Sequence, residues 1–133
     1  MRSQKYQNGL TLIEIMVTVA IVAIIAMVAI PSYQRQALKG KRADGMAILM
    51  DAAARQERYI IDNNQYASTM TALKFADALS QKGHYKVTIA LPTTTSYKMI
   101  AVAQGGQAND ACKNLIIESN GARSSSSALT KCW

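Results

Sequence analysis

The stretch GLTLIEIMVTVAIVAIIAMVAIP, residues 9–31, decides how the rest of the chain is organised. As a helix, residues 10–30 span about 31 Å at roughly 1.5 Å per residue, which matches a bilayer core of about 30 Å. A secretory signal has a shorter apolar core with a small-residue cleavage site after it. Here the small residue, Gly9, comes before the apolar run, so a cut at Gly9 leaves the helix on the product.

Three polar residues interrupt this apolar run: Thr11, Glu14 and Thr18. Their spacing of i, i+3 and i+7 places them on one stripe of the helix. An ionised carboxylate in the hydrocarbon costs about 2.5–3.5 kcal/mol on insertion scales, so it usually has a partner. One interpretation is a membrane anchor whose Glu14 reaches the interface. We favour the other interpretation, a polar seam that meets another helix or a positive charge.

The segment NGLTLIE, residues 8–14, resembles the prepilin cleavage motif of type IV pilins and related pseudopilins. The motif combines a short basic leader, a glycine before the cut and a glutamate five residues into the mature chain. The resemblance implies that a prepilin peptidase cuts after Gly9 and methylates the new amine of Leu10, where the family usually has Phe. It also implies that Glu14 acts in assembly, and we assign Thr11 and Thr18 to the same seam.

Two later stretches resemble minor pilins of the PilE type: DAAARQERY at residues 51–59 and the ending from Cys112 through GAR to Cys132-Trp133. The resemblance implies a minor subunit that supports pilus biogenesis, twitching motility, adhesion or DNA uptake. The implied partners are other pilin subunits, prepilin peptidase, the inner-membrane assembly platform and, before assembly, membrane lipid. A type II secretion pseudopilin shares the N-terminal motif and remains an alternative.

The resulting domain organisation has a cleaved leader at residues 1–9, a transmembrane and filament-core helix at 10–31 and a globular head at 32–133. The count of positive charges alone would place the head in the cytoplasm. The resemblance implies the reverse, a single-pass inner-membrane precursor with a periplasmic head, and an extracellular filament after assembly. We adopt this orientation. The charges that count against it follow the helix at Arg35, Lys39, Lys41 and Arg42.

The helix is expected to continue to Ile61, with a kink at Pro31 because proline lacks a backbone donor. Asp62-Asn63-Asn64 is expected to end it. Beyond Pro31 an apolar stripe is predicted to face the head core, with the methionines as core filler. The charged residues, Arg42 among them, are predicted to form the opposite face. The predicted stripe consists of Ala43, Met46, Ala47, Met50, Ala53, Ala54 and Ile61.

Alternating, β-rich segments at residues 85–91 and 96–103 predict a hairpin, and 115–118 predicts a third strand. A short helix is expected at 68–73, a glycine-containing loop at 104–109 and a loop with little intrinsic order at 122–131. One long helix followed by antiparallel strands is an α+β layout, which is also the pilin architecture.

Two cysteines, Cys112 and Cys132, lie 20 residues apart, and an exported domain is expected to oxidise them to a disulfide. Two free thiols are the alternative. A zinc site has little support because His84 is the single histidine, which we interpret as a solvated turn residue. No nucleophile motif, phosphate loop or metal signature appears, so we expect neither an enzyme nor a cofactor.

The formal charge of +7 raises the alternative that the head captures DNA. The candidate contacts are spread along the head sequence, and this dispersal favours ordinary solvated surface charges. They are Lys74, Lys82, Lys86, Lys98, Lys113, Arg123 and Lys131.

Overall fold

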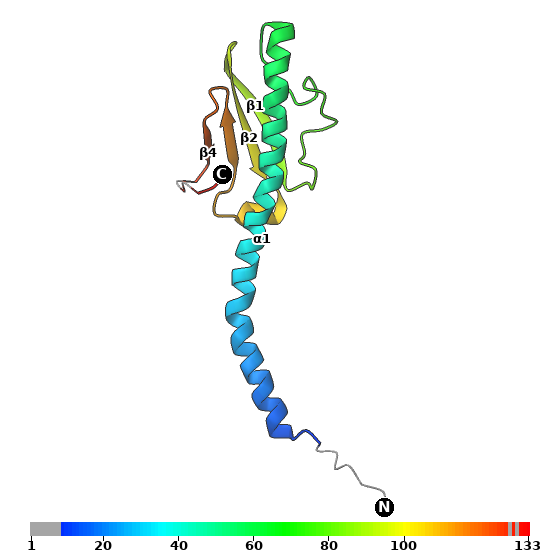
Figure 1. Cartoon of the computed structure of the whole chain (residues 1–133), viewed down its shortest axis with the longest axis vertical. Helices are drawn as coiled ribbons and strands as arrows, with labels where there is room; N and C mark the ends of the chain where they lie inside the picture. Colours follow the sequence, from blue (N-terminus) through cyan, green and yellow to red (C-terminus); the bar gives the residue numbers. More distant parts are fainter. Residues whose placement is uncertain (1–8, 128, 130) are drawn as a thin grey trace, which may run out of the picture. The chain divides into compact units, whose positions relative to one another are not determined.

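The computed structural model of the chain describes residues 9–127, 129 and 131–133. The chain forms two compact units, the first ending at Arg35 and the second running from Gln36 to Trp133. Helix α1 (Leu12–Asn63) contributes residues to both units (Figure 1). It runs through Pro31 without interruption, and a kink there stays a prediction. The leader predicted at residues 1–9 falls outside the described residues, except for Gly9.

The second unit contains a four-stranded antiparallel sheet in the order β1-β2-β3-β4, so the predicted α+β fold is confirmed. The predicted hairpin is the pair of β1 and β2, with Ile89 opposite Met99. Strand β1 runs two residues further than predicted because a register shift after Ala90 accommodates Pro92 on this edge strand. The strands are β1 (Tyr85–Thr93), β2 (Ser96–Ala103), β3 (Leu115–Glu118) and β4 (Arg123–Ser125).

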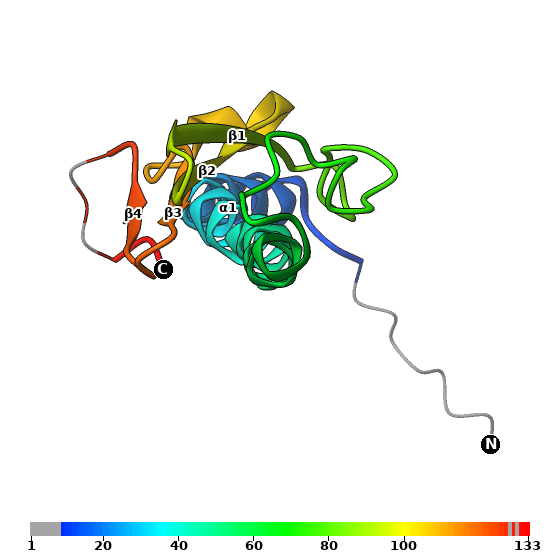
Figure 2. The ribbon, with the colours of Figure 1, turned by 90° about the horizontal axis from the view of Figure 1, so that it is seen from above.

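The sheet packs on one face of the part of α1 that belongs to the second unit (Figure 2). In the first half of β1 and in β2 and β3, more buried side chains alternate with less buried ones, as the period of two requires. Tyr85, Met99 and Leu115 from the sheet are fully buried with Leu49 and Ala52 from the helix. Burial of each large side chain stabilises the fold by about 1.5–3 kcal/mol relative to exposure.

The predicted apolar stripe of α1 is wrong in its rotation about the helix axis. Met50 is 48% exposed and Ile61 is exposed as well, while Met46 is only partly buried. Glycine at position 45 explains part of the rotation, because a Cβ there would lie 2.8 Å from the ring of Tyr85. The face that is actually buried consists of Arg42, Gly45, Ile48, Leu49, Ala52 and Gln56.

Gln56 attaches the connection between α1 and β1 to the helix. Its Nε2 donates to the carbonyl of Ala67 at 2.8 Å, and the amide of Ala67 donates back to Oε1 at 2.8 Å. Both groups are buried, so this pair satisfies two polar groups that would otherwise be costly. The helix predicted at 68–73 is wrong, since these residues form turns.

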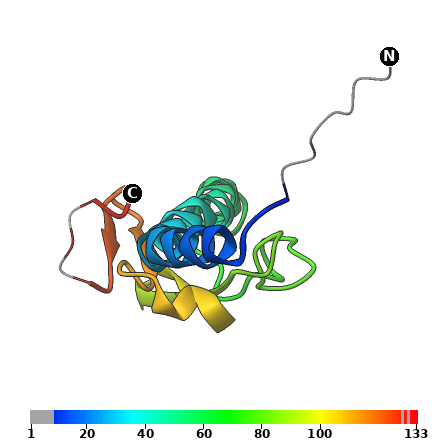
Figure 3. The ribbon, with the colours of Figure 1, turned by 90° about the horizontal axis from the view of Figure 1, so that it is seen from below.

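Two further segments differ from the prediction. The glycine-containing loop holds a short 3-10 helix, η1 (Gly105–Asn109), which lies beside the helix at one end of the sheet (Figure 3). Residues 123–125 of the expected loop form strand β4, with Ser124 opposite Ile116. Serine has modest strand propensity, and β4 forms because β3 offers an unpaired edge to it.

Candidate functional site

The first unit has an almost continuous apolar surface. Large side chains from Leu10 to Ile30 are exposed, with fractions from 48% at Ile15 to 78% at Leu12. Helix α1 is long and apolar enough to cross a membrane by length and composition. A soluble monomer rarely exposes a contiguous apolar patch beyond a few hundred Å². This surface therefore requires lipid or other protein chains to cover it.

The polar seam begins with the cap of α1. Thr11 precedes the first helical residue, and its Oγ1 accepts a hydrogen bond from the amide of Glu14 at 3.3 Å. This is an N-cap, and the Thr-x-x-Glu spacing is that of a capping box. The Thr-x-x-Glu spacing is visible in the sequence, although Thr11 was predicted only as part of the seam.

Thr18 also bonds within its own helix, because its Oγ1 donates to the carbonyl of Ile15 at 2.8 Å. Glu14 differs from the two threonines. Its side chain is exposed, and no ion pair within 4.0 Å joins it to any of the described cationic groups. Glu14 therefore presents the one seam group that still needs a partner, and a cation is the partner that suits a carboxylate.

Gly9 and Leu10 lie outside α1 and are exposed. Nothing lies within 4 Å of the position that a Cβ on Gly9 would take. Backbone of this kind, without helical hydrogen bonds, is the kind that a peptidase can bind.

Helix α1 and the C-terminal part of the head are joined by a buried ion pair. Nε and Nη2 of Arg42 donate to the two carboxylate oxygens of Asp110, each at 2.7 Å. Arg42 is 8% exposed and Asp110 is 3% exposed. The hydrogen-bonded carboxylate raises the pKa of Arg42, although burial acts in the opposite direction. The sequence gives no local signal for this pair because the two residues lie 68 positions apart.

The same ion pair contacts both sides of a disulfide. Cys112 and Cys132 are bonded, with Cα atoms 5.6 Å apart. Asp110 accepts from the amide of Cys112 at 3.3 Å, and Nη1 of Arg42 donates to the carbonyl of Lys131 at 3.4 Å. The two segments that carry the cysteines are therefore also tied to α1. Nearby, Nε2 of Gln107 donates to the carbonyl of Leu38 at 3.0 Å and to the Tyr85 hydroxyl at 2.9 Å.

The disulfide also brings three of the candidate DNA-contacting cations together. Lys113 follows Cys112, and Lys131 precedes Cys132. The disulfide therefore brings the backbones of the two lysines close together. The guanidinium of Arg123 lies 5.5 Å from the centre of the Trp133 ring, and Trp133 Nε1 donates to the Ser124 carbonyl at 2.6 Å. We call Lys113, Arg123, Lys131 and Trp133 the C-terminal basic cluster. None of its cations forms an ion pair with a described carboxylate.

The remaining candidate cations lie elsewhere. Lys98 on β2 pairs with Glu118 on β3 at 3.3 Å, so its charge is offset. Lys86 is on the exposed side of β1. The amide of Lys82 donates to Asp44, which also accepts from Ser80 and from the amide of His84. His84 is half-buried, so its interpretation as a solvated turn residue is only partly correct.

Two lysines adopt a left-handed backbone conformation, with φ of 63° at Lys74 and 52° at Lys113. This region favours glycine, and it costs a residue with a Cβ roughly 1–2 kcal/mol. Within residues 9–127, 129 and 131–133, no group of three or more histidine, cysteine and acidic side chains is placed to hold a metal ion.

Two family profiles match this chain. The profile described as "Type IV minor pilin ComP, DNA uptake sequence receptor" matches residues 31–116, which is more than half of the chain. The profile of the prokaryotic N-terminal methylation motif matches residues 4–30.

Individual proteins extend this similarity. The chain is 38% identical over 99 residues to the type IV wide pilus major component PilA4 of Thermus thermophilus, covering 74% of this chain and 76% of that protein. It is 30% identical over 79 residues to the type IV major pilin protein PilE of Neisseria gonorrhoeae, covering 59% of this chain. It is 32% identical over 68 residues to the type II secretion system core protein G of Pectobacterium carotovorum, covering 51% of this chain. The chain spans 47% and 44% of the length of the last two proteins.

A solved structure of a type IV pilin from Shewanella oneidensis has a similar fold. The TM-score is 0.56 at 23% identity, over 72% of this chain and 97% of that chain. At this identity the likeness concerns the fold alone.

Proposed function

Because the chain belongs to the type IV pilin family, we propose that it works as a minor subunit of a type IV pilus. The observation that carries this proposal is the exposed apolar surface of the first unit, which the described chain does not cover. Lipid covers this surface in the precursor, and the apolar helices of other pilin subunits cover it in the filament. The head, residues 32–133, then forms the filament surface. The role is structural, in pilus biogenesis, twitching motility or adhesion.

Processing removes residues 1–9 in this proposal. Prepilin peptidase cuts between Gly9 and Leu10 and methylates the new terminal amine. The match to the N-terminal methylation motif and the exposed, non-helical backbone at Gly9 support this site. The apolar helix stays on the product because it follows the cut.

Glu14 then pairs with the positive terminal amine of a neighbouring subunit. Thr11 and Thr18 use their hydroxyls within α1, so Glu14 supplies the free polar group of the seam. The amine neutralises a carboxylate that would be costly in the apolar filament core. The pairing thus sets the register between neighbouring subunits.

The precursor in this proposal crosses the inner membrane once, with its head in the periplasm, and the assembly platform passes it into the filament. An oxidising periplasm agrees with the Cys112–Cys132 disulfide. The disulfide also favours a pilus subunit over a type II secretion pseudopilin.

Intact-mass analysis of membrane-extracted protein tests the processing site. The mature protein should lack residues 1–9 and carry one added methyl group on Leu10. Gly9→Val should leave the leader attached, whereas Asn8→Gln should be processed normally. A mature protein that begins at Met1 would refute the proposal.

A second function, capture of DNA, is favoured by the match to the DNA uptake sequence receptor profile and by the C-terminal basic cluster. In this proposal, Lys113, Arg123 and Lys131 bind backbone phosphates. The half-buried Trp133 ring beside the exposed Arg123 adds an aromatic surface of the kind that nucleic-acid sites use.

Fluorescence anisotropy with a labelled mixed-sequence duplex tests this function, using the full chain in maltoside detergent at several salt concentrations. Replacement of Lys113 or Lys131 by Gln should weaken binding and reduce the salt slope by about 1 each. Lys39→Gln is the charge-matched control outside the cluster. Binding that responds equally to all three changes would reject the cluster as the DNA site.

A further inference from the structure

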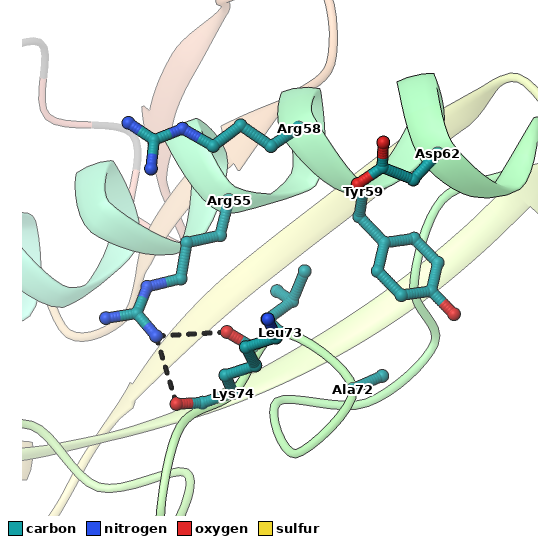
Figure 4. Close-up of a pocket in the computed structure, with 7 residues that line it drawn as sticks. All are labelled: Arg55, Arg58, Tyr59, Asp62, Ala72, Leu73 and Lys74. Carbon is teal, nitrogen blue, oxygen red and sulfur yellow. Dashed lines mark hydrogen bonds between the residues drawn. The ribbon is translucent and has the colours of Figure 1, made fainter.

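A pocket of about 280 Å³ lies between α1 and the turn that precedes Phe75 (Figure 4). Four of its residues come from one face of the helix, at spacings of three, four and seven, and the others come from the turn. The pocket is lined by Arg55, Arg58, Tyr59, Asp62, Ala72, Leu73 and Lys74. It shares no lining residue with the C-terminal basic cluster.

The turn wall of the pocket is fixed by backbone hydrogen bonds. The amide of Lys74 donates to the carbonyl of Thr71 at 2.9 Å, and the amide of Phe75 donates to that of Met70 at 3.1 Å. This pair of bonds is the Schellman pattern, with Lys74 at the left-handed position that glycine usually occupies. The chain therefore keeps a lysine where the backbone alone would favour glycine. Strained residues of this kind concentrate at functional sites.

Arg55 braces this turn. Its Nη1 donates to the carbonyls of Leu73 and Lys74, each at 3.0 Å, as the dashed lines of Figure 4 show. Its Nε and Nη2 donate to the carboxylate of Asp51 at 3.1 Å. The guanidinium also lies 4.0 Å from the centre of the Phe75 ring. With its charge paired and four N–H groups in use, Arg55 holds Lys74 in place and leaves ligand binding to other residues.

Arg58 and Lys74 are the free cations of the pocket. Both are exposed, and neither forms an ion pair within the part of the chain that the structure describes. The half-buried ring of Tyr59 extends from the helix beside Ala72 and forms an apolar wall with a hydroxyl at its end (Figure 4). Asp62 adds one negative charge to the lining. The site therefore offers two cations and one carboxylate, so its unpaired groups keep a net positive charge for a compact anion.

We propose that this pocket binds a compact phosphomonoester, with the phosphate between Arg58 and Lys74 and the organic group against Tyr59. A monoester near neutral pH carries a charge close to −2, and its oxygens accept charge-assisted hydrogen bonds from the two cations. A phosphodiester, as in DNA or a phospholipid backbone, carries a single charge and has two bulky substituents. The site selects the monoester for both reasons.

Calorimetric titration of the full chain in dodecyl maltoside, a detergent without phosphate, tests the proposal. The probes are phenyl phosphate, inorganic phosphate and dimethyl phosphate. Phenyl phosphate should bind more tightly than inorganic phosphate, and dimethyl phosphate should not bind measurably. Binding should weaken as the pH falls below about 6, where the monoester gains a proton. Equal binding of the diester would overturn the proposed selectivity.

Lys74→Gly is the most informative variant because it should lower phosphate affinity without lowering the stability of the fold. It removes a ligand charge but relieves the left-handed backbone, so phosphate affinity should fall at least about tenfold while the melting temperature stays the same or rises. Arg58→Gln should weaken binding similarly. Asn64→Gly, at another left-handed position with φ of 56°, and Lys39→Gln serve as controls. Unchanged affinity in Lys74→Gly, or equal loss in Lys39→Gln, would overturn the site.

Discussion

The two parts of α1 differ in how far their side chains are covered. Residues 12–35 belong to the first unit, where large apolar side chains are exposed and the described chain supplies no cover. Residues 36–63 belong to the second unit, where the buried face includes a charged Arg42, a glycine and an amide. An unbroken apolar run on a helix therefore identifies a surface for lipid or other chains. In the head, polar residues with distant partners decide which face is buried.

The largest expected effect concerns the first part of the helix. Glu14→Val should leave membrane insertion and cleavage intact but lower incorporation into pili by more than about tenfold, since the proposed pairing with the terminal amine of a neighbour would be lost. Insertion should become easier because Val removes an intramembrane charge. The measurement compares cleaved subunit in membranes with subunit in sheared pili.

Met16→Leu, an apolar exchange on the same helix, is the control and should assemble normally. Equal recovery of Glu14→Val and the wild type in pili would refute the assembly role. Loss of cleavage in Glu14→Val would instead assign this residue to recognition by the peptidase.

The next effect tests the buried ion pair of the head. Arg42→Met should lower the free energy of unfolding by about 3–5 kcal/mol because it leaves the Asp110 carboxylate buried without its cation. Lys98→Met is the matched control, since its pair with Glu118 is partly exposed and should cost at most about 1 kcal/mol. Urea unfolding followed by the fluorescence of Trp133, the single tryptophan, measures both.

A double variant sharpens this comparison. Arg42→Met with Asp110→Leu should be less destabilised than the sum of the two single changes, because no buried charge remains unpaired. Simple additivity would show that the two side chains do not depend on each other.

A smaller effect is expected for the disulfide. Joint replacement of Cys112 and Cys132 by Ser should lower the free energy of unfolding by roughly 3 kcal/mol on the chain-entropy model, for a separation of 20 residues. Arg42 should still hold the Asp110 side of this region, so the sheet should persist in far-UV circular dichroism. Peptide mapping without reductant checks the bond first, and recovery of both free thiols from exported protein would contradict it.

The smallest effect is a pH dependence in the head. Burial, and then the charge of Glu57, raises the pKa of Tyr97 to about 12, against about 10 in an unfolded chain. Between these pH values the folded protein keeps a proton that the unfolded chain has lost. The free energy of unfolding should therefore fall as the pH rises from about 10 to about 12. Tyr97→Phe should reduce this slope, while Phe at the exposed Tyr33 should not.

Local patterns were enough to predict several elements of the head. The alternation in residues 85–91 and 96–103 predicted β1 and β2, since a half-buried sheet imposes a period of two. Strand β4 was missed because its serines have little intrinsic preference for a strand, and pairing with β3 supplies the stabilisation. The short helix expected at 68–73 was wrong because Gln56 and Arg55 hold that connection in turns through its backbone.

Some of the candidate sites could likewise be predicted from local sequence, and others depended on contacts between distant residues. Gly9, Leu10 and Glu14 could be selected from the sequence because the motif and the apolar run are local. The C-terminal basic cluster could not, because the disulfide and the contact of Arg123 with Trp133 bring its cations together. Nothing in the sequence distinguishes Lys74 from the other lysines of the head. Its left-handed backbone conformation is known only from the structure.

Hydrophobicity and its period act over neighbouring residues, so the amino-acid pattern was enough to predict an apolar helix of membrane-spanning length before a head with an antiparallel hairpin. The rotation of the helix against the sheet depends instead on contacts between residues that are distant in the chain. Gly45 admits the Tyr85 ring, and Arg42 enters the interior because Asp110 neutralises its charge. A lone arginine reads as a surface residue, since burial of a charge becomes tolerable only when folding brings a distant counter-charge into hydrogen-bonding contact.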